Sequence, residues 1–534
     1  MKVSEFLLRT LEANGVRHIF GNPGTTEIPL VRACEKRRKL KYIVALSEVA
    51  AVPMADGYAR ATRSLGVVNL HVAPGLGNGM GNLYTAGIAG TPLLALIGGQ
   101  DRRFLHTHPI LWGPIEKMAG AVCKAVFALN TRYDAAANVR RALRTALTPP
   151  YSPVALICPP DLLEQDIDAP PAAVHAPRPA ALDAAETKRL AAFLARAKRP
   201  ALIAAEDVHW SDAAQAVEEL ARLLRAPVYV APYTGVLPVS SAAACYAGYL
   251  PPSMKQIVER LAPHDALLFV GGRGFRTTLY SEGRLPQRKA WLGHDASVMA
   301  PDGEFELACV ADARGALRAV ARELGRRKRA AGKQQPLRPA VELPPPQDKL
   351  HPTRAIHTLL DQFGAALWLD ESGLSTSDVR QWMKLPAGDY LINGSGGIGW
   401  GLAAAVGAAI GNPKRQIVAV IGDGSALYAS EALWTAAHHA TKILLVILSN
   451  RRYATLNEAA GRLAGGALDS FTIEPPVIDF GGLATLYDWD YAQASTAAQL
   501  DIFLASARRG ISRNTVLELK LDPSLKPVTA SRHF

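Results

Sequence analysis

Short apolar runs alternate with amphipathic stretches along almost the whole chain, and this alternation predicts its fold. The apolar runs have the length of buried strands, and the stretches between them carry hydrophobic positions at helical spacing. Strands that alternate with helices in this way form parallel sheets covered by helices. The expected strands lie near residues 18–21, 42–46, 66–71, 92–98 and 154–158, then 200–204, 227–230, 266–271 and 290–292, and finally 366–370, 389–392, 417–421, 443–448 and 515–521.

Two proline-rich stretches interrupt the alternation, at residues 166–181 (DIDAPPAAVHAPRPAA) and 334–347 (QQPLRPAVELPPPQ). Proline lacks an amide hydrogen and fixes its φ angle, so such a stretch suits a chain that crosses between domains. We therefore predict three doubly wound α/β domains, at residues 1–165, 182–333 and 348–534. The first and third contain the loops that resemble ligand-binding loops, and the middle one has the character of a scaffold.

Residues 421–450 (IGDGSALYASEALWTAAHHATKILLVILSN) form the most informative unit. An apolar strand ends at a GDG turn, a helix follows, and a second apolar strand ends at Asn450. Since crossovers between parallel strands are right-handed, Asp423 and Asn450 are expected side by side at the carboxyl edge of a sheet. A carboxylate, an amide oxygen and a helix N-terminus behind Gly424 and Ser425 make a site for a hard cation bridged to a phosphate-bearing ligand.

This GDG turn and the asparagine after it resemble the thiamine-diphosphate-binding motif of the thiamine-dependent decarboxylase and acetolactate synthase superfamily. The resemblance extends from Val3 to about Leu521, and the pattern is closest to the benzoylformate decarboxylase branch. It implies a pyrimidine-binding, a middle and a diphosphate-binding domain, with thiamine diphosphate and Mg2+ as cofactors. The metal ligands would be Asp423, Asn450 and the main-chain carbonyl of Arg452. The alternative for GDG alone is a tight turn between strand and helix.

Two further stretches of the third domain would contact the cofactor if the resemblance holds. Gly424 and Ser425 would donate hydrogen bonds to the diphosphate. Gly397 and Ile398 lie in a glycine-rich stretch where the family places a large aliphatic residue. That residue wedges between the two rings of the cofactor and holds it bent. The alternative for Ile398 is simple core packing.

The residues after Asp370 do not by themselves show which side chains or amides would contact the diphosphate. Family members place a hydroxyl-bearing pair here, and direct alignment puts Gly373 and Leu374 at those positions, so that only their backbone could serve. A shift of one or two residues would bring in Ser375 and Thr376 instead. The sequence does not decide between the two pairs.

Glu48 is the candidate for the catalytic carboxylate. It closely follows the apolar strand YIVAL and precedes a helix-like stretch, AAVPMADGYAR, so it faces the ligand edge of the first sheet. In the superfamily, a glutamate in this place hydrogen-bonds the aminopyrimidine ring and thereby activates the cofactor. The alternative is a helix-capping glutamate on the surface.

Two more residues of the first domain are candidates for contact with the substrate or for proton transfer. Thr25 follows a Gly-Asn-Pro-Gly loop that borders the substrate in the family, where benzoylformate decarboxylases have serine; the alternative is a structural turn. His71 ends the strand GVVNLH before a glycine-rich loop, and its family counterpart relays protons.

One departure from the family pattern concerns the middle domain. Benzoylformate decarboxylases draw a second active-site histidine from it, whereas the corresponding stretch here, GGRGFRTTLY, has Thr278 in that place. Weaker protonation of the reacting carbon would favour its attack on an aldehyde. His106 and His108 are possible replacements, while His438 and His439 are expected to be structural. The Arg-Phe-Asp-Asp run of flavin-binding members is absent, so FAD is not expected.

Composition limits the remaining classes of function. The 534 residues carry a net charge of +12, but the basic residues are scattered apart from runs at Lys36–Lys41 and Arg326–Lys333, so we expect no nucleic-acid binding. No apolar run of about 18 uncharged residues occurs, so we expect no membrane span, and the N-terminus has the pattern of an amphipathic helix, not a signal peptide. Five scattered cysteines without a CxxC motif favour a reducing cytoplasm.

The leading hypothesis is thus a thiamine-diphosphate- and Mg2+-dependent enzyme that converts a 2-oxo acid into an aldehyde. The first alternative is a carboligase that forms 2-hydroxyketones or acetolactate-type products. A catalytically weak regulatory homologue would be expected to lose Asp423, Asn450 or Glu48, and all three are present. A flavodoxin-like binding module does not account for Glu48 together with the paired metal ligands. The family places the cofactor between two subunits, which implies a homodimer or homotetramer.

Overall fold

The computed structural model describes residues 1–532 except for residues 178, 273, 295–304, 327–337 and 339. Within these residues the chain forms three six-stranded sheets in which all neighbouring strands are parallel. The predicted fold class is therefore confirmed. Residues 334–337 and 339 of the predicted second linker, and residues 327–333 of the basic run that begins at Arg326, lie outside the described residues.

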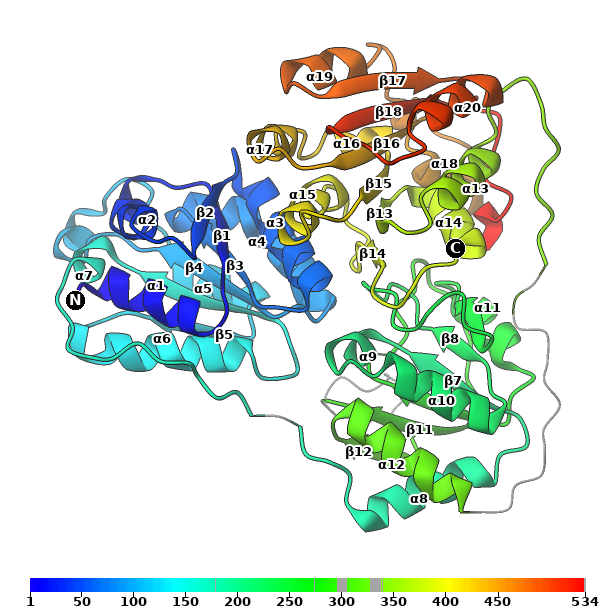
Figure 1. The fold of residues 1–534 in the computed structure, drawn as a ribbon, viewed down its shortest axis with the longest axis horizontal. Coiled ribbons are helices and arrows are strands. Elements are labelled where there is room, and N and C mark those ends of the chain that lie inside the picture. Colours follow the sequence, from blue (N-terminus) through cyan, green and yellow to red (C-terminus); the bar gives the residue numbers. More distant parts are fainter. Residues whose placement is uncertain (178, 273, 295–304, 327–337, 339, 533–534) are drawn as a thin grey trace.

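Each sheet belongs to one part of the chain (Figure 1). The strand orders are β2-β1-β3-β4-β6-β5, β12-β11-β10-β7-β8-β9 and β14-β13-β15-β16-β18-β17. The strands are β1 (His18–Gly21), β2 (Lys41–Val44), β3 (Gly66–Leu70), β4 (Leu93–Gly98), β5 (Ala125–Ala128), β6 (Pro153–Cys158), β7 (Pro200–Ala204), β8 (Val228–Val230), β9 (Tyr246–Tyr249), β10 (Ala266–Val270), β11 (Arg288–Gly293), β12 (Leu307–Val310), β13 (Leu367–Glu371), β14 (Tyr390–Ile392), β15 (Ile417–Gly422), β16 (Ile443–Ser449), β17 (Asp490–Ala494) and β18 (Thr515–Lys520).

The helices connect these strands and pack against the sheets. In the first domain they are α1 (Val3–Ala13), α2 (Ile28–Glu35), α3 (Glu48–Thr62), α4 (Val72–Ile88), α5 (Ile115–Val122), α6 (Arg132–Ala146) and α7 (Pro160–Leu163). In the middle domain they are α8 (Ala184–Ala195), α9 (Glu206–Trp210), α10 (Ala214–Leu224), α11 (Met254–Leu261) and α12 (Ala313–Gly325). In the third domain they are α13 (Pro352–Gln362), α14 (Thr376–Trp382), α15 (Gly401–Gly411), α16 (Asp423–Ala426), α17 (Ala432–His438), α18 (Ala454–Leu463), α19 (Phe480–Leu486) and α20 (Ala497–Ser506).

Four strands that the apolar runs did not predict are β5, β9, β12 and β17. Each of them lies at an edge of its sheet, and each has partly exposed residues along its length. An edge strand needs fewer apolar residues because it is covered less completely by the rest of the domain. This is why the pattern of apolar runs missed them.

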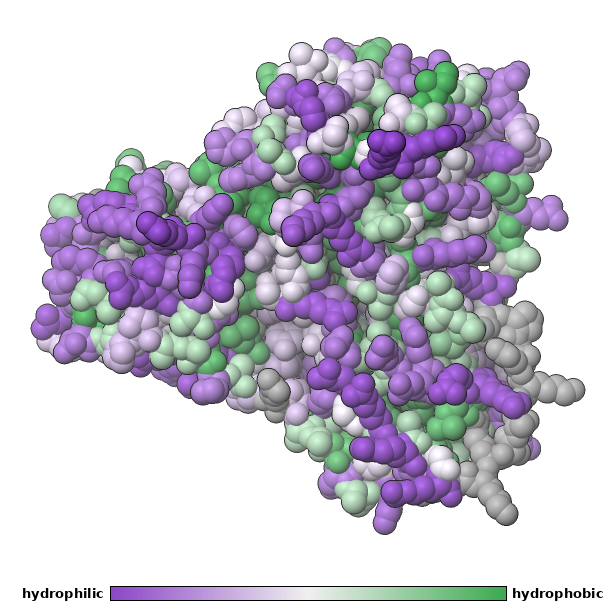
Figure 2. All heavy atoms as spheres, in the orientation of Figure 1, coloured by the Kyte–Doolittle hydropathy of each residue, from purple (hydrophilic) through white to green (hydrophobic). Residues whose placement is uncertain are grey.

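Figure 2 shows that hydrophilic side chains cover most of one face of the molecule, while apolar residues gather in the recess between the first and third domains. Within the ranges that the structure describes, no helix is both long and apolar enough to cross a membrane.

The first and third domains meet where helix α3 crosses helix α15 (Figure 1). The two backbones approach so closely that both contact positions must be glycine. A Cβ atom on Gly57 would lie 2.2 Å from the carbonyl oxygen of Ala404, and one on Gly407 would lie 1.8 Å from that of Met54. Any larger residue at either position would push the two helices, and so the two domains, apart.

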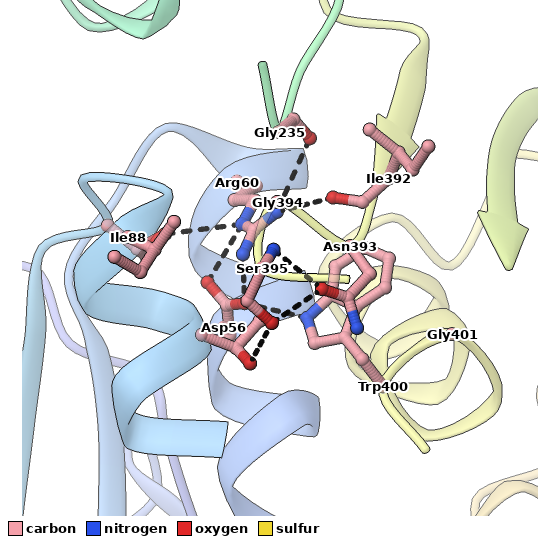
Figure 3. A network of polar contacts seen from close by, with 12 residues as sticks. Asp56, Arg60, Ile88, Gly235, Ile392, Asn393, Gly394, Ser395, Trp400 and Gly401 are labelled. Carbon is pink, nitrogen blue, oxygen red and sulfur yellow. Dashed lines mark hydrogen bonds and ion pairs between the residues drawn. The ribbon is translucent and has the colours of Figure 1, made fainter. Parts of the chain in front are cut away.

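A buried ion pair lies at this crossing and joins all three domains (Figure 3). Arg60 and Asp56 of α3 are 1% and 0% exposed and pair with each other. The Arg60 guanidinium also donates to the carbonyl oxygen of Ile392 in the third domain, at 2.9 Å, and to that of Gly235 in the middle domain, at 3.3 Å. The indole N–H of Trp400 donates to Asp56 Oδ2 at 2.7 Å.

Removal of one partner should therefore destabilise the protein strongly. Arg60→Met leaves the buried Asp56 carboxylate without its cation, and we expect a loss of about 3–5 kcal/mol in the free energy of unfolding, measured by urea denaturation. The matched control is Asp212→Asn, which removes the charge that pairs with Arg63 on the surface, where the side chains are 39% and 61% exposed. That change should alter the free energy of unfolding by less than about 1 kcal/mol. Equal effects of the two substitutions would contradict the structural role of the pair.

Candidate active site

A cavity of about 1970 Å³ lies between the middle and third domains, at the carboxyl ends of β13, β15 and β16. The structure brings all the predicted third-domain residues together in its wall. They are Gly373, Leu374, Gly397, Ile398, Asp423, Gly424, Ser425, Asn450 and Arg452. Ser375 and Thr376 also line the cavity, so position alone does not choose between the two candidate pairs for the diphosphate.

Asp423 is fixed by the backbone of the neighbouring strand end. It is 3% exposed, and its Oδ2 accepts hydrogen bonds from the amides of Asn450 at 2.9 Å and Arg451 at 2.6 Å. Its Oδ1 accepts from the amide of Gly424 at 2.8 Å. Burial raises the pKa of the Asp423 carboxyl, and these amides act in the opposite direction. The side chain is thus held at the sheet edge predicted from the crossover.

The oxygen donors at this edge fit a hard cation such as Mg2+. They are a carboxylate from Asp423, a side-chain amide oxygen from Asn450 and the carbonyl of Arg452. Across the part of the chain that the structure describes, no cluster of three or more His, Cys, Asp or Glu residues could hold a metal. A cation at Asp423 would therefore need oxygens from a bound ligand to complete its coordination, as expected for one bridged to a diphosphate.

Ile398 lies in the cavity wall with 39% of its surface exposed. Simple core packing is therefore excluded for this side chain. Its loop follows β14, where Asn393 Oδ1 accepts from the amides of Ser395 at 2.8 Å and Gly396 at 3.2 Å. These bonds order the beginning of the loop.

Glu371 is a residue of this region to which the sequence assigned no role. It ends β13, lines the cavity, and is 8% exposed. Its carboxylate accepts hydrogen bonds from the amides of Gly399 at 2.5 Å and Trp400 at 2.9 Å, and from that of Gly401. Burial raises the pKa of Glu371 to about 7, although these amides and the Ser425 hydroxyl lower it. The only sequence signal was a carboxylate at the carboxyl end of a strand.

Glu48 is the first residue of α3 and is 5% exposed. Two side-chain amides donate to its carboxylate, from Asn78 at 3.2 Å and Asn22 at 3.4 Å. A Cβ atom on Gly75 would lie 2.8 Å from Glu48 Oε1, so the glycine-rich helix α4 approaches the carboxylate closely. The residue is therefore not a surface helix cap.

His71 precedes α4 and is oriented by a carboxylate that the sequence reasoning missed. Its Nδ1 lies 2.7 Å from Oε2 of Glu27, which is 2% exposed and also accepts from the amide of Gly24 at 2.8 Å. A carboxylate at Nδ1 fixes the ring and leaves Nε2 to exchange protons. Thr25 is exposed at the start of a short 3-10 helix, whereas the hydroxyl oxygen of Thr26 lies 3.3 Å from His71 Nδ1.

The structure does not bring these first-domain residues into the cavity. Neither Thr25, Glu48 nor His71 lines it; α4 contributes Tyr84 and Ile88 instead. Within one chain, the residues with candidate chemistry thus form two separate groups.

Thr278, expected in the place of a histidine, does line the cavity, and its hydroxyl lies 2.6 Å from that of Tyr233. Among the described residues of the cavity wall there is no histidine. His106 and His108 are exposed near the short 3-10 helix Arg102–Thr107, and His438 ends α17. None of them reaches the wall of this cavity as the described chain forms it.

The sequence matches three parts of one protein family. Residues 1–116 match the N-terminal TPP binding domain of thiamine pyrophosphate enzymes, residues 187–320 their central domain, and residues 371–518 their C-terminal TPP binding domain. A benzoylformate decarboxylase from Pseudomonas aeruginosa is 33% identical over 512 residues, which cover 92% of this chain and 93% of that protein. A putative acetolactate synthase large subunit from Mycobacterium tuberculosis is 27% identical over 535 residues, which cover 91% of this chain and 92% of that protein.

Solved structures agree with this similarity. The thiamine diphosphate-dependent 4-hydroxybenzoylformate decarboxylase of Rhodococcus jostii RHA1 superposes with a TM-score of 0.88 at 29% identity, covering 98% of this chain and 99% of that one. The benzoylformate decarboxylase of Polynucleobacter necessarius superposes with a TM-score of 0.91, covering 99% and 100%, but at 24% identity it supports the fold alone.

The buried carboxyl of Glu371 should make stability depend on pH. Because its pKa is raised to about 7 in the folded protein, from an ordinary value of 4.5, the folded state binds a proton that the unfolded state has lost. The contribution of Glu371 to stability is fully present below about pH 4.5 and is lost as pH rises from about 4.5 to 7. The urea midpoint of wild type, relative to that of Glu371→Gln, should therefore fall as pH rises from about 4.5 to 7. If the midpoint of wild type instead rises relative to that of the variant, the three amides outweigh burial in setting the pKa of Glu371.

Proposed function

Because the chain belongs to the thiamine pyrophosphate enzyme family, we propose that it is a thiamine-diphosphate- and Mg2+-dependent decarboxylase that converts a 2-oxo acid into an aldehyde. The observation that carries this proposal is the cavity in which Asp423 and Asn450 face the loop of Ile398. The similarity to benzoylformate decarboxylases supports a 2-oxo acid as the substrate class.

The third domain would hold the cofactor by its diphosphate end. Asp423, Asn450 and the carbonyl of Arg452 would bind Mg2+, and Gly424 and Ser425 would donate hydrogen bonds to the diphosphate. When bound, thiamine diphosphate supplies the nucleophilic carbon and the electron sink that loss of CO2 requires. Ile398 would contact the rings of the cofactor, because it is the large apolar side chain that the loop exposes to the cavity.

The first domain would supply the groups that handle protons. Glu48 would hydrogen-bond the pyrimidine ring, and its burial beside Asn22 and Asn78 keeps the carboxylate in one orientation. His71 would exchange a proton at Nε2 while Glu27 holds Nδ1. Thr25 would contact the substrate with its hydroxyl.

We further propose that the complete site forms between two copies of the chain, in a homodimer or homotetramer. Glu48 and His71 lie apart from the cavity of their own chain, so a second copy must bring them to the cofactor. The first domain exposes large apolar side chains at the start of α2 and in several loops, and a partner would cover them. They include Ile28 (56% exposed), Leu46 (45%), Ile110 (85%) and Trp112 (51%).

Mixing two inactive variants tests the shared site. Glu48→Gln and Asp423→Asn should each abolish turnover when assayed alone. After the two are unfolded and refolded together, dimers that contain one copy of each have one intact site, so about a quarter of the wild-type activity should return. The control is each variant refolded with itself. If no activity returns although mixed dimers form, Glu48 and Asp423 act within the same chain.

A carboligase is the second candidate, and Thr278 is the observation that favours it. With no histidine among the described residues of the cavity wall, the middle domain supplies no imidazole to protonate the reacting carbon. Slower protonation of the reacting carbon would give a second carbonyl time to react.

Product analysis tests the proposed function. Purified protein with thiamine diphosphate and Mg2+ is offered benzoylformate, pyruvate and aliphatic 2-oxo acids, with and without an added aldehyde. Release of CO2 with free aldehyde supports the decarboxylase, and a 2-hydroxyketone as the main product supports the carboligase. Chelation of the metal should stop either reaction, and Mg2+ should restore it. No turnover of any 2-oxo acid by the cofactor-loaded protein would refute both.

Thr278→His should shift the products towards the free aldehyde. An added general acid in the cavity wall speeds protonation, and such a group contributes about 100- to 10,000-fold, so we expect the ratio of aldehyde to hydroxyketone to rise by roughly tenfold or more. Thr278→Asn is the matched control, because it adds bulk and hydrogen bonds without a titrating group. An equal change in both variants would assign the effect to pocket shape.

A further inference from the structure

The loop between β14 and α15 (residues 393–400) carries Ile398 on a backbone with little intrinsic rigidity. Four of the eight residues from 393 to 400 are glycine, and the segment has no regular secondary structure. Gly396 and Gly399, on either side of Ile398, have φ angles of +83° and +96°. The position of the Ile398 side chain therefore depends on the groups that hold the ends of the loop.

The beginning of the loop is held by contacts from all three domains. Asn393 binds the amides of Ser395 and Gly396, and the Ser395 hydroxyl lies 2.9 Å from that of Thr85 in the first domain. Arg276 of the middle domain donates to the carbonyl oxygen of Gly394 at 3.4 Å.

The end of the loop is held at Trp400. Its indole ring is fully buried, lies 4.7 Å below the guanidinium of Arg60 and donates its N–H to Asp56 (Figure 3). These contacts fix the side chain, but they leave the backbone between Ile398 and Trp400 to be held by another group.

Glu371 supplies that group. It accepts three consecutive backbone amides, those of Gly399, Trp400 and Gly401, which begin directly after Ile398. Glu371 itself ends β13, which lies between β14 and β15 and pairs with both, so the sheet fixes its backbone. A carboxylate that binds successive amides at a helix N-terminus also stabilises that terminus electrostatically.

We propose that Glu371 is a positioning residue, which sets the depth of Ile398 in the cavity by fixing the three amides that follow it. The inference rests on the proposed function, in which Ile398 supports the cofactor rings. Loss of these bonds would let Ile398 withdraw, while the diphosphate and its cation stay bound at Asp423. Cofactor affinity should then change little and the rate of turnover should fall, because the rate depends on how the two rings are oriented.

Two variants and a control test this role. Glu371→Ala removes both carboxylate oxygens, which accept from the three amides, and Glu371→Gln retains one accepting oxygen, so it should act as a partial rescue. Glu518→Gln is the control, since Glu518 is also a buried carboxylate of the third domain (4% exposed) and binds the Tyr491 hydroxyl away from the cavity wall.

Amide hydrogen exchange of the cofactor-free protein reports the backbone directly. In the peptide that covers residues 393–402, exchange should be roughly tenfold faster in Glu371→Gln than in wild type, faster still in Glu371→Ala, and unchanged in Glu518→Gln. If exchange of this peptide is unchanged in both Glu371 variants, the proposal is wrong. This readout needs neither cofactor nor substrate, so it is independent of the proposed function.

Kinetics then separate positioning from a merely structural role. We expect kcat to fall roughly tenfold in Glu371→Gln at a pH above the pKa of Glu371, with less than about a threefold change in the Kd for thiamine diphosphate. If the loop exchanges faster in the Glu371 variants but kcat is unchanged, Glu371 does not affect turnover through the position of Ile398. Absence of turnover in the wild type itself would refute the proposed function and leave the exchange result standing.

Discussion

The buried pair of Asp56 and Arg60 is the interaction on which the arrangement of the three domains depends. A buried charge is tolerated only when its partner and its hydrogen bonds are complete, and here they are completed by groups from the middle and third domains. The pair lies on α3, beside the crossing at which Gly57 and Gly407 let α3 and α15 touch. If the domains moved apart, Arg60 would lose its bonds to Gly235 and Ile392, and Asp56 would lose its bond to Trp400.

The crossing also bears on the candidate chemistry, because both crossing helices have candidate residues at or next to their N-termini. Helix α3 starts with Glu48, and α15 starts directly after the loop that carries Ile398. When the crossing fixes the axes of the two helices, it also fixes where their N-termini lie. The same contacts that join the domains thus position one carboxylate of the first domain and one apolar side chain of the third.

Backbone amides hold three of the carboxylates that matter here. Glu371 accepts from the amides before and at the start of α15, Asp423 from those after β16, and Glu27 from that of Gly24. These amides lie at helix N-termini or in turns, where they have no partner within a helix. Each carboxylate is therefore oriented before any ligand arrives, and burial raises the pKa of Glu371 and Asp423.

The sequence by itself determined the fold class, the strands inside each sheet, and the neighbourhood of Asp423 and Asn450, because these follow from local patterns. An interior strand must be continuously apolar, and a right-handed crossover places its two ends side by side. Only the tertiary structure identified the edge strands β5, β9, β12 and β17, the pairing of Glu27 with His71, the amides bound by Glu371, and the separation of Glu48 from the cavity of its own chain. These features join residues that are far apart in the sequence, or depend on how completely a residue is covered by other domains, and no local pattern records either.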